Sequence, residues 1–146
     1  GEEVLAADGK AAYADAINRA RIGWGAMALG TCQALLDYVI PYCNERLAFG
    51  EPISHRQAVA FMVADIGIEL ESMRMLVYRA AGRIDASLPC AREAYLARTL
   101  CSDKAMEIGT NGVQLLGGAG FIKDHPVELW YRQLRSIGVM DGNLLV

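Results

Sequence analysis

The chain has 146 residues, of which 53% are hydrophobic and 21% charged, and its formal net charge is −3. This length allows one domain with a core of its own, and the scattered basic residues argue against nucleic-acid binding. The longest uncharged runs, residues 22–36 and 108–122, are shorter than the roughly 18 apolar residues of a membrane span. The N-terminal GEEVLAADGK contains no signal-peptide core. We therefore expect a cytoplasmic protein that binds neither nucleic acid nor membrane, with apolar faces that meet other protein.

Helical periodicity dominates the first half of the chain. The first nineteen residues read as the exit from a preceding domain followed by a helical lead-in. A long helix is expected from Ala20 to Arg46, rich in small residues that permit close approach of a neighbour, with Pro41 kinking it or removing a hydrogen bond. A second helix is expected from Ser54, as N-cap, to about Ala86. Its apolar residues recur three or four positions apart, as an amphipathic helix requires: Val59, Met62, Val63, Ile66, Leu70, Met73, Val77 and Ala80.

The second half continues the helical pattern. A third helix is expected from about Pro89 to Leu116, with Ser87 as N-cap and a stop at Gly117. A last helix begins near Pro126, capped by one of the two residues before it (Asp124 or His125), and fades around Gly138. No strand pattern competes. Long helices with short connections hide their apolar stripes only by packing antiparallel. The predicted fold is therefore all-α, an up-and-down four-helix bundle with long helices.

The cysteines and histidines do not form a recognisable metal or redox motif. The four cysteines have no CxxC pair and are predicted to be small buried hydrophobes: Cys32, Cys43, Cys90 and Cys101. His55 and His125 each lie beside a proline or a helix-start signal and have no partner at ligand spacing. No metal site is expected.

Four short stretches are candidates for function, and each by itself favours a structural reading. Residues 45–50 look like a helix end, and the glycines within 117–120 like a helix stop and turn. Residues 124–135 look like a surface helix, and residues 140–143 like a turn around a single carboxylate. The glycine stretch is no phosphate loop, because it has neither GxxxxGK nor a preceding strand.

The order and spacing of these stretches resemble the C-terminal helical domain of the acyl-CoA dehydrogenase flavoprotein family. The matching motifs are RxxFGxxIxxxQ at 46–57, VADI at 63–66, QxxGGxGF at 114–121 and DxPVE followed by YR within 124–132. The resemblance covers residues 17–143 and implies that residues 1–16 lead in from a preceding domain. Residues 17–146 would then be the bundle that also builds the core of a tetramer, as a dimer of dimers.

The resemblance also implies that FAD lies between this bundle and a central domain, its adenosine and pyrophosphate end reaching a neighbouring subunit's bundle. The family's contacts to that end fall on Arg46, Phe49, Gln114, Gly117 and Gly118. A guanidinium suits the paired anionic oxygens of a pyrophosphate, and glycine lets the backbone approach the dinucleotide. One further flavin contact falls on Asn143, where the family has threonine.

The reaction that the resemblance implies is the α,β-dehydrogenation of an acyl-CoA thioester, with an electron-transfer flavoprotein as the electron acceptor. The family's catalytic base is the glutamate of an EGT segment, and its place here is taken by Asp141, in the sequence DGN. A minority branch carries its base at the position of Ala20. Arg21 and Asn18 are expected on the substrate side. Aspartate is one methylene shorter than glutamate, and a misplacement of about 1 Å costs on the order of a hundredfold in rate.

Three explanations of the aspartate stay open at this point. In the first, the substrate sits deeper, so that the aspartate reaches it. In the second, the chain is a weakly active or noncatalytic scaffold subunit of a mixed oligomer. In the third, the chemistry is a carbon-acid oxidation, as in the related nitroalkane oxidases, which use an aspartate at this place. The working assembly is either a homo-oligomer or a mixed one. The 146 residues alone are expected to be inactive, because the flavin ring pocket lies largely in another domain.

Overall fold

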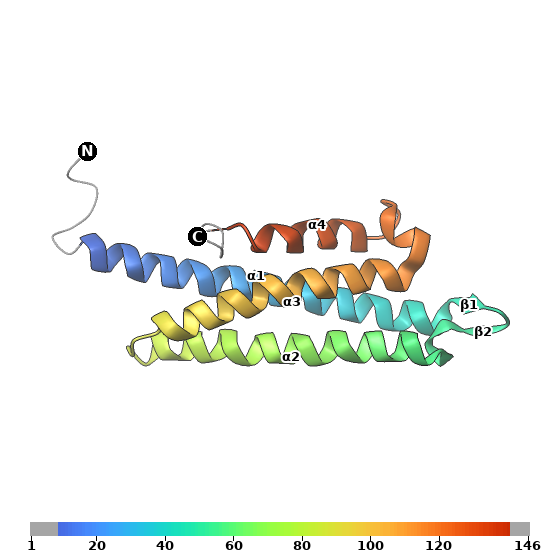
Figure 1. Cartoon of the computed structure of the whole chain (residues 1–146), viewed down its shortest axis with the longest axis horizontal. Coiled ribbons are helices and arrows are strands. Elements are labelled where there is room, and N and C mark those ends of the chain that lie inside the picture. The colour runs from blue at the N-terminus through green and yellow to red at the C-terminus, as the bar shows by residue number, and fades with distance from the viewer. Residues whose placement is uncertain (1–8, 141–146) are drawn as a thin grey trace.

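The computed structural model describes residues 9–140 and shows four α-helices that run alternately up and down (Figure 1). The connections between α1 and α2 and between α3 and α4 lie at one end of the bundle, and the connection between α2 and α3 lies at the other. The predicted all-α four-helix bundle is confirmed. The helices are α1 (Gly9–Glu45), α2 (Gln57–Asp85), α3 (Ala91–Leu116) and α4 (Val127–Ile137).

Helix α1 is longer than the sequence indicated. It begins at Gly9 rather than Ala20, so the expected helical lead-in is continuous with this helix. Alanine is the strongest helix former, and an ion pair between Arg19 Nε and Asp15 Oδ2, 2.7 Å apart and one turn from each other, supports this part of the helix. The helix continues through Pro41. Proline has no backbone N–H, so the carbonyl one turn earlier in the helix lacks its usual hydrogen-bond donor.

The N-caps expected for α2 and α3 are wrong. Helix α2 begins after Arg56, since Ser54 lies within a 3-10 helix, η1 (Ile53–His55). Helix α3 begins after Cys90, and Ser87 lies in the preceding turn with a φ of 54°. Serine serves turns as readily as caps because its hydroxyl bonds to nearby backbone in both. Local sequence therefore did not distinguish the two roles.

In the α3–α4 connection the predicted helix stop and the predicted helix start are confirmed, but the predicted N-cap is wrong. Gly117 ends α3 as predicted, and a second 3-10 helix follows, η2 (Gly117–Phe121). Helix α4 begins near Pro126 as predicted, but its N-cap is Pro126 itself rather than Asp124 or His125. Proline fits the beginning of a helix because its fixed φ is already helical and it needs no hydrogen-bond acceptor.

A short hairpin joins α1 to α2, although no strand was expected. Strands β1 (Leu47–Ala48) and β2 (Glu51–Pro52) pair antiparallel. The two residues between them, Phe49 and Gly50, have φ values of 57° and 87°, as a type I′ hairpin turn requires. Strands of two residues are too short to show an alternating pattern, so periodicity did not reveal them.

The core lies along α3, which packs against each of the other three helices. The predicted stripe of α2 faces it: Ile66, Leu70, Met73, Val77 and Ala80 are buried, and Val59, Met62 and Val63 pack at its edge. All four cysteines are buried and free, as predicted. Two glycines allow close helix contacts. A Cβ at Gly25 would lie 2.9 Å from Val77 Cγ2, and one at Gly112 would lie 2.6 Å from Leu35 Cδ1.

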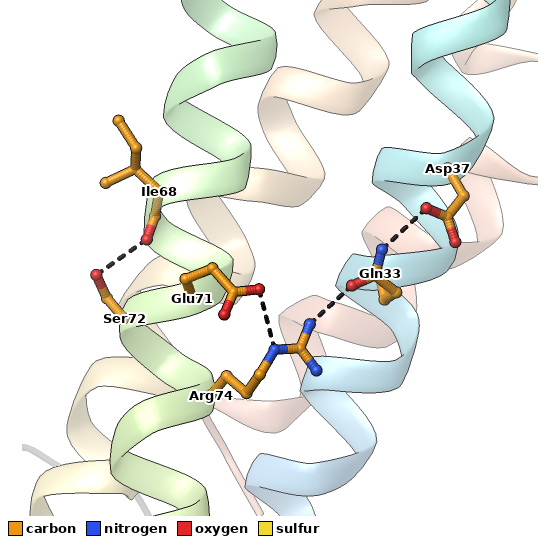
Figure 2. A network of polar contacts seen from close by, with 6 residues as sticks. All are labelled: Gln33, Asp37, Ile68, Glu71, Ser72 and Arg74. Atoms are coloured by element: carbon orange, nitrogen blue, oxygen red, sulfur yellow. Dashed lines mark hydrogen bonds and ion pairs between the residues drawn. The ribbon is translucent and has the colours of Figure 1, made fainter.

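A polar bridge sets the position of α1 against α2 (Figure 2). Arg74 on α2 donates from Nη2 to Gln33 Oε1 on α1 at 2.7 Å and from Nε to Glu71 Oε1 at 3.0 Å. Gln33 in turn donates to Asp37 Oδ1 at 2.9 Å. The bridge restrains the relative sliding of the two helices, and hence where the C-terminal end of α1 lies. Among residues 9–140, no helix is long and apolar enough to cross a membrane.

Candidate cofactor-binding site

A cavity of about 660 Å³ lies at the end of the bundle that carries both the β-hairpin and η2. It brings Arg46, at the end of α1, together with Gln114, Gly117 and Gly118 from the end of α3 and the start of η2. These two segments are far apart in the sequence and meet because α1 and α3 run in the same direction. The lining residues are Tyr42, Arg46, Ile53, Gln114, Leu115, Leu116, Gly117, Gly118, Ala119 and His125.

The fold requires glycine at two of the three glycine positions of QLLGGAGF. Gly117 has φ 59° and ψ −135°, a region of backbone space that essentially only glycine enters. Gly120 packs against α3, where an added Cβ would lie 2.4 Å from the carbonyl oxygen of Val113. A Cβ on Gly118 would meet no atom within 4 Å, and its φ is not positive. Nothing within the described chain therefore requires glycine at 118, which borders the cavity.

Arg46 supplies the cavity with a cation. Its side chain is exposed, and within residues 9–140 no carboxylate lies at ion-pair distance from it. Its backbone is held on both sides: its N–H donates to Tyr42 O, and its carbonyl accepts from the N–H of Ile53, each at 2.9 Å. The hairpin is thereby tied back to α1, which leaves the guanidinium at the cavity with its donors available for a bound anion.

Tyr42 and His125 complete the wall, and Tyr38 contacts His125 from behind it; no role at this site was predicted for any of the three from the sequence. His125 Nδ1 lies 2.7 Å from Tyr38 Oη, and the ring of Tyr42 meets the His125 ring edge-on with centroids 5.8 Å apart. Tyr42 Oη also donates to the carbonyl of Leu116 at 3.5 Å. Tyr42 lies one turn before Arg46, so helical spacing contained a signal for it. His125 lies within the DxPVE motif, but it occupies the variable position of that motif, so the motif did not indicate a role for it.

Phe49 does not line this cavity. It lies at the tip of the hairpin with 96% of its surface exposed, and the guanidinium carbon of Arg56 lies 5.1 Å from its ring centroid. A positive φ is unusual for a bulky residue, so the fold holds this ring outward at some conformational cost. Its full exposure makes it available to a group outside this chain.

The expected substrate-side residues are separate from the cavity. Arg21 and Asn18 are half-buried on the N-terminal half of α1, and 25 helical residues place Arg21 roughly 38 Å along the helix from Arg46. Arg21 has its guanidinium carbon 6.0 Å from the ring centroid of Tyr95. Asp141 and Asn143 lie outside the described residues.

A second cavity of about 220 Å³ lies between α1 and α4 and begins at Trp24, one turn after Arg21. It extends to Met140, the residue before Asp141 in the sequence. Its other lining residues are Met27, Thr31, Gln133, Leu134, Ser136 and Ile137. Trp24 and Met140, the residue before the candidate base, thus border one hollow, whereas Arg21 and Asn18 do not line it.

The titratable groups of the core do not suggest redox or metal chemistry. Burial raises the pKa of Cys32 and of Cys101 to about 12 in each case, which keeps these thiols protonated and poorly nucleophilic at neutral pH. No cluster of three or more histidine, cysteine or acidic residues able to hold a metal ion occurs in the part of the chain that the structure covers.

The fold and the cavity define a class: a helical bundle with a cationic, glycine-lined hollow at one end, suited to an anionic ligand. Comparison with known proteins makes the assignment specific. The model of the acyl-CoA dehydrogenase C-terminal domain matches residues 7–144. The chain belongs to this family, as its motifs indicated.

Several relatives illustrate the match. The chain is 39% identical over 126 residues to the bovine mitochondrial short-chain specific acyl-CoA dehydrogenase, covering 86% of the chain and 31% of that protein. It is 38% identical to subunit CarC of the caffeyl-CoA reductase-Etf complex of Acetobacterium woodii over 84% of the chain and 32% of the relative. The butyryl-CoA dehydrogenase structure from Megasphaera elsdenii superposes with a TM-score of 0.86 at 32% identity, over 89% of this chain and 34% of that one. The chain thus spans about a third of the length of these relatives.

Proposed function

We propose that this chain is the C-terminal domain of an FAD-dependent acyl-CoA dehydrogenase and that its end cavity binds the adenosine and pyrophosphate part of FAD. The observation that carries the proposal is the meeting of Arg46 with Gln114 and the two exposed glycines around one hollow. Arg46 has donors for paired phosphate oxygens. Gly118 offers bare backbone that the chain's own packing does not require. Phe49, at the hairpin tip, would contact a dinucleotide shared with a second subunit.

The reaction proposed is the removal of one hydrogen from each of the α and β carbons of an acyl-CoA thioester. FAD, when bound, accepts the β-hydrogen with its electron pair as a hydride. Asp141 is the proposed base: its carboxylate takes the α-proton, and the electron pair of that C–H bond becomes the new bond between the two carbons. A carboxylate works as such a base when it is ionised but poorly solvated. Asn143 is proposed to hydrogen-bond the flavin, and Arg21 and Asn18 to face the thioester. An electron-transfer flavoprotein would then reoxidise the cofactor.

The test is an anaerobic titration of the full-length protein, followed by the flavin absorbance. Acyl-CoA thioesters are expected to bleach the flavin, and Asp141→Asn is expected to abolish bleaching while the bound FAD remains. Asp141→Glu, which restores the family's usual base, should retain activity. Bleaching by a nitroalkane but not by a thioester would favour carbon-acid oxidation, and no bleaching by either would favour a noncatalytic scaffold subunit. The 146 residues alone are expected to hold little FAD.

We also propose that the bundle associates with further copies of itself through α2. Phe61, Ile68 and Met75 recur every seven residues on α2 and are 59%, 64% and 71% exposed. Tyr78 extends the same face with 63% exposed. Seven-residue spacing of apolar side chains is the pattern by which one helix packs along another, and a second copy offers the same stripe for an isologous contact.

Sedimentation of the full-length protein tests this proposal. Ile68→Glu places a charge at the centre of the stripe and should reduce the assembly to smaller species, while the same change at Leu88, which is 51% exposed in the turn after α2, should not. An unchanged sedimentation coefficient in Ile68→Glu would contradict the role of this face. A wild-type assembly that forms only with a second polypeptide would indicate a mixed oligomer instead.

A further inference from the structure

Arg98 is a buried cation that the cofactor cavity does not use. It lies on α3 and has only 2% of its surface exposed. Nη1 donates to Ser102 Oγ, one turn further along the same helix, at 2.8 Å, and Ser102 Oγ donates back to Arg98 O at the same distance. Ser102 therefore holds the guanidinium in a defined orientation. Burying an arginine is costly unless its donors are satisfied.

The donors of Arg98 are directed to the end of α4. Nη1 donates to the carbonyl of Ile137, and Nη2 donates to the carbonyls of Gly138, at 3.4 Å, and Met140. Ile137 is the last residue of α4 and Gly138 its C-cap. The last carbonyls of a helix have no partner within it and carry partial negative charge. A guanidinium is the side chain suited to this task, because its planar fork reaches several acceptors at once.

These carbonyls lead directly into the proposed base. Met140 immediately precedes Asp141 in the sequence. Because a peptide unit is planar, hydrogen bonds to a carbonyl restrict the orientations of the peptide unit that joins it to the next residue. Arg98 thus restrains the backbone between the end of α4 and the residue on which catalysis is proposed to depend.

We propose that Arg98 is a positioning residue for Asp141. It acts through the backbone of residues 137–140 and does not itself contact substrate. The inference rests on the proposed function, since it matters for catalysis only if Asp141 is the base. The backbone before Asp141 must be positioned more accurately than before a glutamate, because the shorter aspartate side chain can compensate less for a displaced backbone. A shift of about 1 Å costs on the order of a hundredfold in rate.

The competing role for Arg98 is purely structural, as a cap that stabilises α4. Arg83 provides a matched control, because its Nε donates to the carbonyl of Pro89 at 2.6 Å and so holds a different turn, between α2 and α3. Arg83 also pairs with the buried Glu93, its Nε 3.3 Å from Oε2. Replacing it removes an arginine–carbonyl hydrogen bond and an ion pair without touching the segment before Asp141.

The experiment compares Arg98→Met, Arg98→Lys and Arg83→Met in the full-length protein. Four quantities are measured: bound FAD, melting temperature, the KM for acyl-CoA and the rate of flavin reduction at saturating substrate. For Arg98→Met we expect flavin reduction to slow on the order of a hundredfold. The KM and the bound FAD should change less than threefold, and α-deuterated substrate should give a larger deuterium isotope effect than in the wild type. Arg98→Lys should recover only part of the rate, because an ammonium lacks the planar fork. Arg83→Met should lower the melting temperature and leave the rate unchanged.

Each result decides between the roles. Arg98→Met with the wild-type rate, or with a loss of rate that Arg83→Met reproduces at equal loss of stability, would refute positioning. If Arg98→Met does not fold, Arg98→Lys decides: a full wild-type rate refutes the inference, and a reduced rate with unchanged KM supports it. If no acyl-CoA reduces the flavin of the wild-type protein, the proposed function is wrong and this inference falls with it. The wild-type titration therefore distinguishes failure of the proposed function from failure of the inference alone.

Discussion

Replacing Gly118 by alanine tests whether glycine at this position is required for folding or for FAD binding. The added methyl group would meet no atom of the chain within 4 Å, and the backbone of Gly118 has no positive φ. The substitution should therefore not destabilise the fold, and the loss of unfolded-state entropy should add about 0.4–1 kcal/mol of stability. The same methyl group would occupy the wall of the proposed FAD cavity. Crowding of a close-packed contact costs about 1–3 kcal/mol, or a roughly 5- to 150-fold weaker affinity.

The assay combines a thermal melt with FAD titration of the full-length apoprotein. Gly118→Ala is expected to melt at or slightly above the wild-type temperature in the absence of FAD and to bind FAD more weakly. Gly82→Ala is the matched control: its Cβ also meets nothing within 4 Å, but it lies on α2 away from the cavity, so its FAD affinity should not change. Gly120→Ala should do the opposite and destabilise the fold, because of its contact with Val113. If Gly118→Ala binds FAD as tightly as wild type, the assignment of the cavity is wrong.

Three further predictions concern the cavity and the core. Arg46→Met should weaken FAD binding more than tenfold in an FAD titration, with little change in melting temperature, whereas Arg46→Lys should retain part of the affinity. If Arg46→Met binds FAD as tightly as the wild type, Arg46 does not contact the phosphates. Gly112→Ala should lower the free energy of unfolding by about 1–3 kcal/mol through overlap with Leu35, and Leu35→Val should relieve part of that loss in the double variant, measured by urea denaturation. Because burial raises the pKa of Cys32 and of Cys101 to about 12 from an ordinary value of 9.0, the folded state keeps protons that the unfolded state releases between pH 9 and 12. Stability is then complete below pH 9 and falls above it, by roughly 3 kcal/mol for both thiols at pH 10; a Cys32→Ala, Cys101→Ala double variant with the same decline would refute this.

The helices and their buried faces were predictable because they depend on local properties. Apolar residues three or four apart in α2 define its stripe whatever it packs against, and Gly117 stops α3 because its backbone conformation excludes a side chain. The family was equally accessible from the sequence, since several motifs in a fixed order and spacing carry more information than any one of them.

Fine local choices were not predictable. Ser54 and Ser87 both read as N-caps, yet one lies in a 3-10 helix and the other in a left-handed turn, because capping and turn-forming use the same hydroxyl chemistry. The hairpin around Phe49 could not be predicted from periodicity, because its two strands have only two residues each.

The amino-acid sequence by itself determined that this protein is a bundle of long helices, which face of α2 is buried and to which family the chain belongs, because periodicity and motif order are local properties of the chain. Only the tertiary structure decided which distant residues meet. The parallel course of α1 and α3 brings Arg46 to Gly117 and Gly118. The packing of α4 and the segment before it against α1 and α3 brings His125 to Tyr38 and places Arg98 under the end of α4. The physical reason is that such meetings depend on how helices pack and slide against one another, a property of the whole set of contacts that no single segment contains.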